Sequence, residues 1–268
     1  MKNILVLAHD DDGQEARMQV ALDLGRALAG HVTCLGVIYV PPIAGGGFAE
    51  DAYALADLMT EGTTRERTNR ARLETRLAGE GVPWDWIEAT GDIAPCIAQA
   101  AALADVIVVN RTLDDASVID MRRTAGELIV RSGRPVLAVP GHCKGLDPSS
   151  ALVAWDGSPC AATALRAAVP LLALADHVIL FEVEDGSIEV PTEDAARYLS
   201  RHGIHAVIRR VAVPFEGVAA RIVDEATTGS FGYVVMGGYG HHRFVEAMFG
   251  GVTRAMLNTS PIPVLMAH

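Results

Sequence analysis

Glycine residues are concentrated in the stretch Val234–Thr253, VVMGGYGHHRFVEAMFGGVT, in a spacing that can hold a phosphate group. An apolar run typical of a buried strand ends at Gly237, and the pair Gly250-Gly251 precedes a run with helical periodicity. Glycine lets a ligand approach the backbone closely, and the unpaired N–H groups at a helix N-terminus attract anions. The stretch therefore favours a phosphate ligand, although tight turns that bind nothing would use the same residues.

Length and composition limit the classes of function. The chain has 268 residues, enough for one large or two ordinary domains, and a formal net charge of -11. An acidic chain binds nucleic acids poorly unless it has a basic stripe, and the arginines of residues 65–76 are interleaved with glutamates, as on a solvated helix face. No apolar stretch approaches the ~20 residues of a membrane span. We therefore expect neither nucleic-acid nor membrane partners.

The cysteine and histidine residues indicate the compartment and argue against a metal. The four cysteines are scattered without a CxxC pair, which fits reduced thiols in a cytoplasmic protein. His241 and His242 are adjacent, and neighbouring residues share neither a helix face nor a strand face. We therefore expect no metal site.

Short apolar runs alternate with helical patterns along the whole chain. Strands are expected at 3–8, 32–40, 82–88, 105–109, 135–139, 151–154, 178–183, 207–213, 232–236 and 263–266. Helices are expected at 14–29, 50–79, 92–104, 117–132, 161–174, 193–202, 217–226 and 252–259. This alternation predicts an α/β fold with parallel strands and right-handed crossovers.

The pattern of elements occurs twice. Turn-forming residues in Pro140–Ser149 interrupt the periodicity, and the sequence RSGRPVLAVP (residues 131–140) is echoed by NTSPIPVLMA (residues 258–267). The chain is therefore predicted to contain two copies of one unit, with domains at 1–142 and 149–268. The last strands, 135–139 and 263–266, are apolar edge candidates that would invite association if they were left open.

Together these features resemble the universal stress protein family in its tandem form. Nucleotide-binding members of that family carry Gly-x2-Gly-x9-Gly-(Ser/Thr) after the fourth strand, and this chain has Gly237-x2-Gly240-x9-Gly250-Gly251. The family also places an aspartate at the end of the first strand, which is Asp156 in the run AWDGS. The resemblance implies an adenine nucleotide alpha hydrolase-like fold: two tandem open parallel five-stranded sheets, each ordered 3-2-1-4-5 and flanked by helices. Such sheets bind ligands where the strand order reverses.

The resemblance implies roles for residues of the second copy. Ala154, Asp156, Val183, Met236 and Gly237 would lie beside the base and the sugar, and Gly240, Gly250, Gly251, Val252 and Thr253 would surround the phosphates. His241 or Arg243 would add positive charge, unless they are solvated loop side chains. Gly251 stands where the family has a hydroxyl. A lost hydroxyl–phosphate hydrogen bond costs roughly 1.5–3 kcal/mol, or about ten- to a hundred-fold in affinity, so weakened binding is expected.

The first copy departs further from the family pattern. Asn110 and Arg111 stand where the second copy has its first glycines, and Arg122 and Arg123 stand near the position of the second pair. These side chains would block a phosphate path or form an anion patch, although arginines exposed on a helix surface are the commoner outcome. Asp10 is retained at the end of the first strand, but Asp11 and Asp12 would repel phosphates. We expect a degenerate copy that pairs with the second copy as an intramolecular pseudo-dimer; two chains could pair further as a homodimer.

Three functions compete. The first is a cytoplasmic, regulatory stress-response protein that binds ATP or another adenine nucleotide. The second is a scaffold that acts by protein contacts, and the third is a slow ATPase with Mg²⁺. The sequence has no GxxxxGK[ST] or HExxH motif and no evident Mg²⁺-binding carboxylate near the phosphate loop, where Glu246 is a candidate by proximity alone. Since phosphoryl transfer needs positioned charge, we favour binding over strong catalysis and assign no catalytic residues.

Overall fold

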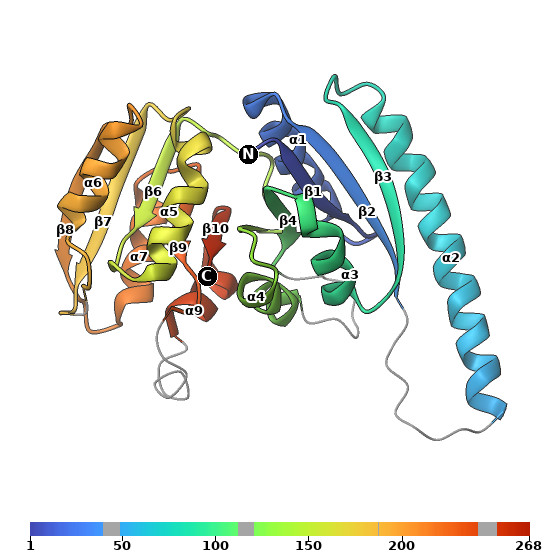
Figure 1. The fold of residues 1–268 in the computed structure, drawn as a ribbon. Coiled ribbons are helices and arrows are strands. Elements are labelled where there is room, and N and C mark those ends of the chain that lie inside the picture. The colour runs from blue at the N-terminus through green and yellow to red at the C-terminus, as the bar shows by residue number, and fades with distance from the viewer. Residues whose placement is uncertain (40–48, 112–120, 187, 241–250) are drawn as a thin grey trace.

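The computed structural model describes residues 1–39, 49–111, 121–186, 188–240 and 251–268, with residues 49–58 described by their backbone alone (Figure 1). The first half contains β1 (Asn3–Ala8), α1 (Gln14–Leu28), β2 (His31–Tyr39), α2 (Ala49–Leu77), β3 (Trp84–Gly91), α3 (Ile93–Ala100) with a 3-10 turn at Ala101–Leu103, β4 (Val106–Asn110), α4 (Met121–Arg131) and β5 (Val136–Val139). The second half contains β6 (Ser150–Ala154), α5 (Pro159–Leu172), β7 (His177–Glu184), α6 (Thr192–Arg201), β8 (Ala206–Ala212), α7 (Val218–Thr228), β9 (Tyr233–Gly237), α9 (Gly251–Thr259) and β10 (Val264–Ala267).

All ten described strands belong to one sheet, in the order β3-β2-β1-β4-β5-β10-β9-β6-β7-β8. Each half has the predicted order 3-2-1-4-5 and is parallel within itself, so the predicted fold class is confirmed. The two predicted sheets are not separate, however. The last strands, β5 and β10, pair antiparallel with each other and join them. This pairing occupies the edges that would otherwise invite association.

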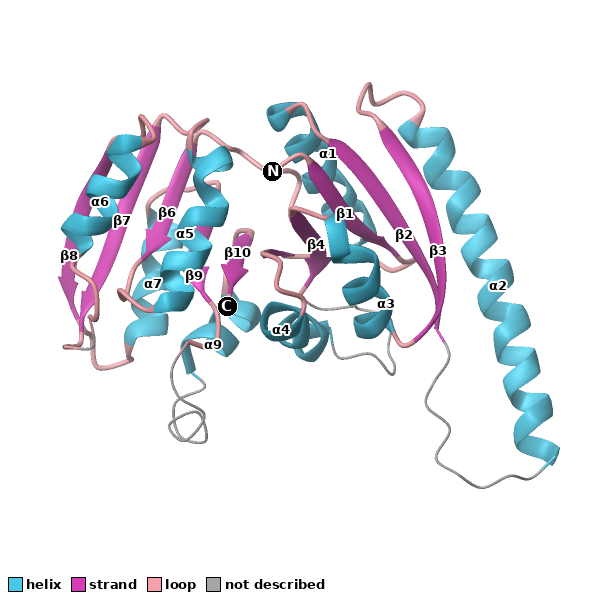
Figure 2. Cartoon of the chain, viewed as in Figure 1, coloured by secondary structure: helices cyan, strands magenta, loops and turns pink. Residues whose placement is uncertain are grey.

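Helices cover both faces of the sheet (Figure 2). Residues of α1, α2, α5 and α6 share one apolar core with one face of the strands. Residues of α3, α4, α7 and α9 share a second core with the opposite face. The central strands are buried on both faces, which explains their continuous apolar runs. Among the described residues, no helix combines the length and the hydrophobicity needed to cross a bilayer.

An approximate twofold relation connects the two halves through their hydrogen-bond register. Leu137 of β5 lies directly opposite Leu265 of β10. Across the parallel strands, Leu137 is level with Val108 and Val6, and Leu265 is level with Val235 and Val153. Val6 therefore corresponds to Val153. A residue that follows Val6 by a given number of positions corresponds to the residue that follows Val153 by the same number.

This register corrects the expected match between the two first-strand aspartates. Counted from Val6 and Val153, Asp156 corresponds to His9, and Asp10 lies one position further along the chain. The carboxylate of Asp10 accepts a hydrogen bond from Arg72 of α2 at 2.6 Å. Asp10 is therefore engaged with α2 and does not repeat the position of Asp156.

Candidate functional site

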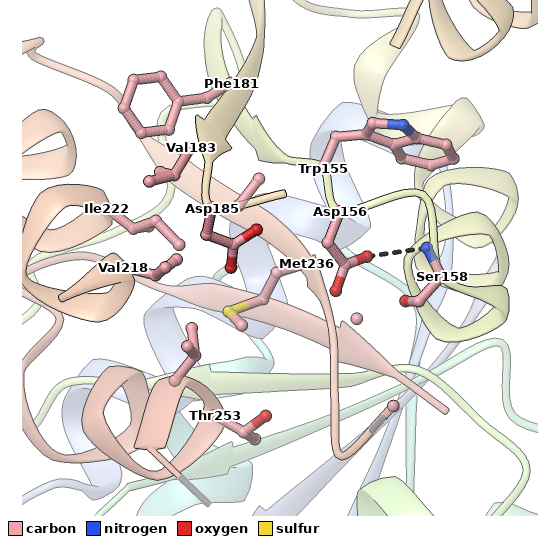
Figure 3. A pocket seen from close by; sticks show the side chains of 14 residues that line it. Trp155, Asp156, Ser158, Phe181, Val183, Asp185, Val218, Ile222, Met236 and Thr253 are labelled. Carbon is pink, nitrogen blue, oxygen red and sulfur yellow. Dashed lines mark hydrogen bonds between the residues drawn. The ribbon is translucent and has the colours of Figure 1, made fainter. Parts of the chain in front are cut away.

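A cleft opens in the second half beside the carboxyl ends of β6 and β9, where the strand order reverses (Figure 3). Its walls come from these strands and the loops that follow them, from the end of β7, from the N-terminal half of α7 and from the first turn of α9. The lining residues are Ala154, Trp155, Asp156, Ser158, Phe181, Val183, Asp185, Val218, Ile222, Met236, Gly237, Gly240, Val252 and Thr253. Open α/β sheets bind ligands at this kind of switch point.

The Asp156 carboxylate is fixed by a local turn. The Ser158 backbone N–H donates to Asp156 Oδ1 at 2.9 Å, and Ser158 Oγ accepts from the Ala161 N–H at 3.1 Å, which caps α5. Asp185, after β7, presents a second carboxylate to the cleft, and Met236 lies between the two acids (Figure 3). The two carboxylates can accept hydrogen bonds from hydroxyl or amino groups of a ligand.

Apolar side chains form the wall between α7 and the strands. Phe181, Val183, Val218, Ile222 and Met236 provide it, and all five project toward the same space (Figure 3). Such a surface suits the faces of a flat heterocycle, with orientation set by a few polar groups at its edge.

The indole N–H of Trp155 bonds to a residue that does not line the cleft. Its indole Nε1–H donates to the Val190 carbonyl at 3.0 Å, and the side chain is largely buried. This bond fixes the ring beside the cleft, so Trp155 supports the wall and does not move freely to stack on a ligand.

The glycine residues of the turn after β9 are not required by their own backbone conformation. Gly237, Gly238 and Gly240 do not adopt left-handed backbone conformations; Tyr239 does, with φ of 54°. The glycines instead allow close packing. A Cβ on Gly237 would lie 2.6 Å from the Ala161 backbone nitrogen, and one on Gly238 would lie 2.6 Å from Ile129 Cγ2.

Gly240 allows the turn to lie against the start of α5. A Cβ at this position would lie 3.2 Å from Cys160 Cβ and 3.3 Å from Ser158 Oγ. Burial raises the pKa of the Cys160 thiol, and the charges of Asp156 and Glu189 raise it further. The neutral thiol is therefore favoured where Cys160 packs against the turn.

The start of α9 forms the opposite corner of the cleft. Thr253 lies in its first turn, and Thr253 Oγ1 accepts a hydrogen bond from the Tyr239 backbone N–H at 3.1 Å. This bond ties the glycine turn to the helix. The first turn contains no acidic residue, so the partial positive charge of the helix N-terminus is not neutralised within that turn. A Cβ on Gly251 would have no other atom within 4 Å.

The cleft brings together most of the predicted site residues. Those that line it are Ala154, Asp156, Val183, Met236, Gly237, Gly240, Val252 and Thr253. Gly251 begins α9 without lining the cleft. Gly250, together with His241, His242, Arg243 and Glu246, lies outside the described residues.

Sequence reasoning missed Trp155, Ser158, Phe181, Asp185, Val218 and Ile222. The sequence contains patterns that indicate some of these residues. Phe181, Val183 and Asp185 alternate along one strand and its extension, so their side chains point to the same face. Val218 and Ile222 are four residues apart on α7 and also share a face.

A buried arginine joins the ends of β1 and β4 in the first half. Arg17 of α1 is 0% exposed, and its guanidinium forms an ion pair with Asp11 at 2.6 Å. It also donates to the Leu7 carbonyl at 2.5 Å, to the His9 carbonyl and to Asn110 Oδ1. Leu7 and His9 mark the end of β1, and Asn110 ends β4. The side chain therefore occupies the space between these two strand ends.

Arg111 does not lie on a helix surface or in an anion patch. It is buried, and Arg111 Nη1 donates to the carbonyls of Met256 at 3.4 Å and Leu257 at 3.3 Å in α9. Burial lowers its pKa. Arg122 contacts Asn258 Oδ1 at 3.4 Å at the surface. The described residues contain no cluster of three or more histidine, cysteine, aspartate or glutamate side chains that could hold a metal ion.

Comparisons with known proteins agree with this architecture. The sequence model of the Universal stress protein family matches residues 149–268. A universal stress protein from Archaeoglobus fulgidus DSM 4304 superposes with a TM-score of 0.75 at 16% identity, over 100% of this chain and 98% of that chain. A functionally unknown protein from Pseudomonas aeruginosa PAO1 gives a TM-score of 0.57 at 19% identity, over 100% of this chain and 92% of that chain. No curated protein matches the sequence. At these identities the two structures establish likeness of fold.

Proposed function

Because residues 149–268 belong to the universal stress protein family, we propose that the chain binds an adenine nucleotide, in the first instance ATP, in the cleft of its second half. One observation carries the proposal. One part of the cleft has an apolar wall and the two carboxylates of Asp156 and Asp185, and the other part has the glycine turn and the start of α9, at Gly240 and Thr253. A nucleotide has groups that match these surfaces in the same order: a flat base, a sugar with hydroxyl groups, and an anionic phosphate chain.

The residues present fit such a ligand. The aliphatic wall of Val218, Ile222 and Met236 would contact the faces of the base. Asp156 and Asp185 would accept hydrogen bonds from the sugar hydroxyls or the exocyclic amine. The α9 N-terminus, whose first turn lacks acidic residues, would attract the phosphates. Bound ATP, through its charge and its shape, would stabilise one arrangement of the aliphatic wall, the two carboxylates and the α9 N-terminus.

The proposed role is regulatory and not strongly catalytic, since the sequence lacks a P-loop. The protein would act in the cytoplasm as a stress-response protein, with domains at 1–142 and 149–268. The first domain would serve as the fixed partner of the second, in a pseudo-dimer held by β5 and β10. A homodimer of two chains would use other surfaces, since these two strands already pair with each other.

The decisive experiment is a calorimetric titration of the purified chain with ATP. We expect a dissociation constant of about 1 μM to 1 mM. The absence of heat at millimolar ATP would overturn the proposal and favour the scaffold. Mass spectrometry of small molecules released on denaturing the purified protein would identify a ligand that remains bound during purification.

A matched pair of variants localises the site. Asp156→Asn keeps the oxygen that accepts the Ser158 N–H and removes the charge in the cleft. Asp147→Asn makes the same change in an equivalent turn outside the cleft, where Asp147 Oδ1 accepts the Ser149 N–H at 2.9 Å. Asp156→Asn should weaken ATP binding about ten-fold, and Asp147→Asn should not. Equal effects would place the ligand elsewhere. Phosphate release that disappears in Asp156→Ala would instead support an ATPase.

A further inference from the structure

The glycine turn of the cleft rests on a helix of the first half. The phenol oxygen of Tyr239 lies only 2.5 Å from the place where a Cβ on Gly126 would be, and the Tyr239 Cζ lies 3.3 Å from it. Gly126 belongs to α4, so the absence of a side chain there makes room for a ring from the second half. Helices α4 and α9 pack side by side at this junction (Figure 1).

Other residues of the first half support the same region. The Ile129 side chain fills the space beside Gly238, since a Cβ on that glycine would lie 2.6 Å from Ile129 Cγ2. Arg111 donates to the carbonyls of Met256 and Leu257 in α9. The glycine turn and α9 form the end of the cleft that we assign to phosphate, and both contact the first half.

The backbone of Tyr239 shows why this support matters. Its φ of 54° lies in the left-handed region, which a side chain with a Cβ disfavours. Such a conformation persists when its surroundings hold it. Here the Tyr239 N–H is bound to Thr253 Oγ1 at 3.1 Å and the ring is seated against Gly126. Removing either contact would let the turn relax toward a commoner conformation.

We propose that Gly126 and Tyr239 are positioning residues, through which the first half holds the glycine turn in its ligand-binding conformation. This inference rests on the proposed nucleotide function. The first half would then contribute to the site of the second half without touching the ligand. Its role would be to set the distance between Gly240 and the start of α9, which fixes where a phosphate can sit.

A double-mutant cycle tests the contact. Gly126→Ala places a methyl carbon where the Tyr239 hydroxyl lies, and it should weaken ATP binding about three- to ten-fold. Tyr239→Phe removes the hydroxyl oxygen, and the double variant should bind within about two-fold of wild type. Gly62→Ala in α2 is the control, because the nearest atom to its Cβ would be Ile38 Cγ2 at 3.6 Å. If Gly126→Ala does not fold, Tyr239→Ala, which adds no atoms, replaces it with the same expected weakening.

A second readout needs no ligand. Amide hydrogen exchange of Tyr239, measured by NMR, reports the bond from its N–H to Thr253. Exchange should be faster in Gly126→Ala and restored in the double variant. Unchanged exchange together with unchanged ATP affinity would overturn the inference. If wild type binds no ATP while Gly126→Ala still accelerates exchange, the proposed function fails and the positioning contact stands. If wild type binds no ATP and exchange at Tyr239 is unchanged in Gly126→Ala, both proposals fail.

Discussion

Asn110 and Gly237 occupy corresponding positions at the ends of β4 and β9, and each faces the first residues of the helix that follows the half's first strand. A Cβ on Gly13, at the start of α1, would lie 2.8 Å from Asn110 Cγ. A Cβ on Gly237 would lie 2.6 Å from the Ala161 nitrogen in α5. In both halves the strand end and the helix start approach closely, so one of them must carry a glycine. In the first half it is Gly13 at the helix start, and in the second half it is Gly237 at the strand end.

Gly237 should therefore matter for stability. In Gly237→Ala the new methyl would meet the backbone of α5, which cannot swing aside as a side chain can. We expect a loss of about 1–3 kcal/mol in the free energy of unfolding, measured by urea denaturation. Gly251→Ala is the control, since no atom lies within 4 Å of its Cβ position. Equal stabilities of the two variants would contradict the packing argument.

Gly251→Ser should strengthen ATP binding. The position has room for a side chain and a backbone that is not left-handed, and a hydroxyl there would restore the group found in the family motif. A new hydrogen bond to phosphate would raise affinity by about ten-fold. Calorimetric titration beside Gly251→Ala, which adds the Cβ without the hydroxyl, separates this bond from a backbone effect. No gain over the alanine variant would mean that the phosphates do not reach this corner.

Arg17→Met should destabilise the first half strongly. It would leave the Asp11 carboxylate buried without its ion pair and would remove the donors to the Leu7 carbonyl and to Asn110. Breaking a buried pair by removing one partner costs about 3–5 kcal/mol, which thermal or chemical denaturation would measure. Arg131→Met, which removes the exposed ion pair with Glu127, should cost less than about 1 kcal/mol. A small effect at Arg17 would show that solvent can replace its contacts.

Glu66 should make stability fall as pH rises. It is buried in α2 against Gly36, and burial raises the pKa of its carboxyl to about 7, assisted by Glu88 and Asp10 and opposed by Arg65 and Arg70. Because the folded chain binds this proton more tightly than the unfolded chain, the stabilisation is present below the unfolded pKa of 4.5 and is lost as pH rises to about 7.

Glu66→Gln removes this proton linkage. The variant should be more stable than wild type above pH 7 by on the order of 2 kcal/mol, and the difference should shrink toward pH 4.5. Melting temperatures of both proteins across this range would measure it. A difference that does not depend on pH would show that the carboxyl titrates normally.

The order of elements could be read from the sequence because it depends on local patterns. Runs such as NILVLA and DVIVV identify buried strands, and the repeated order identifies the sheet of each half. The helix of residues 50–79 was also clear, but the burial of Glu66 was not. Its neighbour Gly36 lies thirty residues away in sequence, and nothing local to the helix indicates it.

The sequence predicted those residues of the cleft that lie in one motif or at one strand end. Asp156, Gly240 and Thr253 were found in this way. Ile222 was missed because a helix that faces the site looks the same in sequence as a helix that faces the core. Arg17 was missed because a single arginine in an amphipathic helix is ordinarily exposed, and its partner Asn110 is 93 residues away.

The antiparallel pairing of β5 with β10 has a consequence for how the protein would respond to its ligand. Two separate subunits part on dilution, whereas the halves of one chain meet at an effective concentration on the order of millimolar whatever the protein level. With the one proposed site, in the cleft of the second half, the stoichiometry would be one ligand per chain and the saturation curve a simple hyperbola. The occupied fraction would then follow the concentration of the nucleotide and not the abundance of the protein.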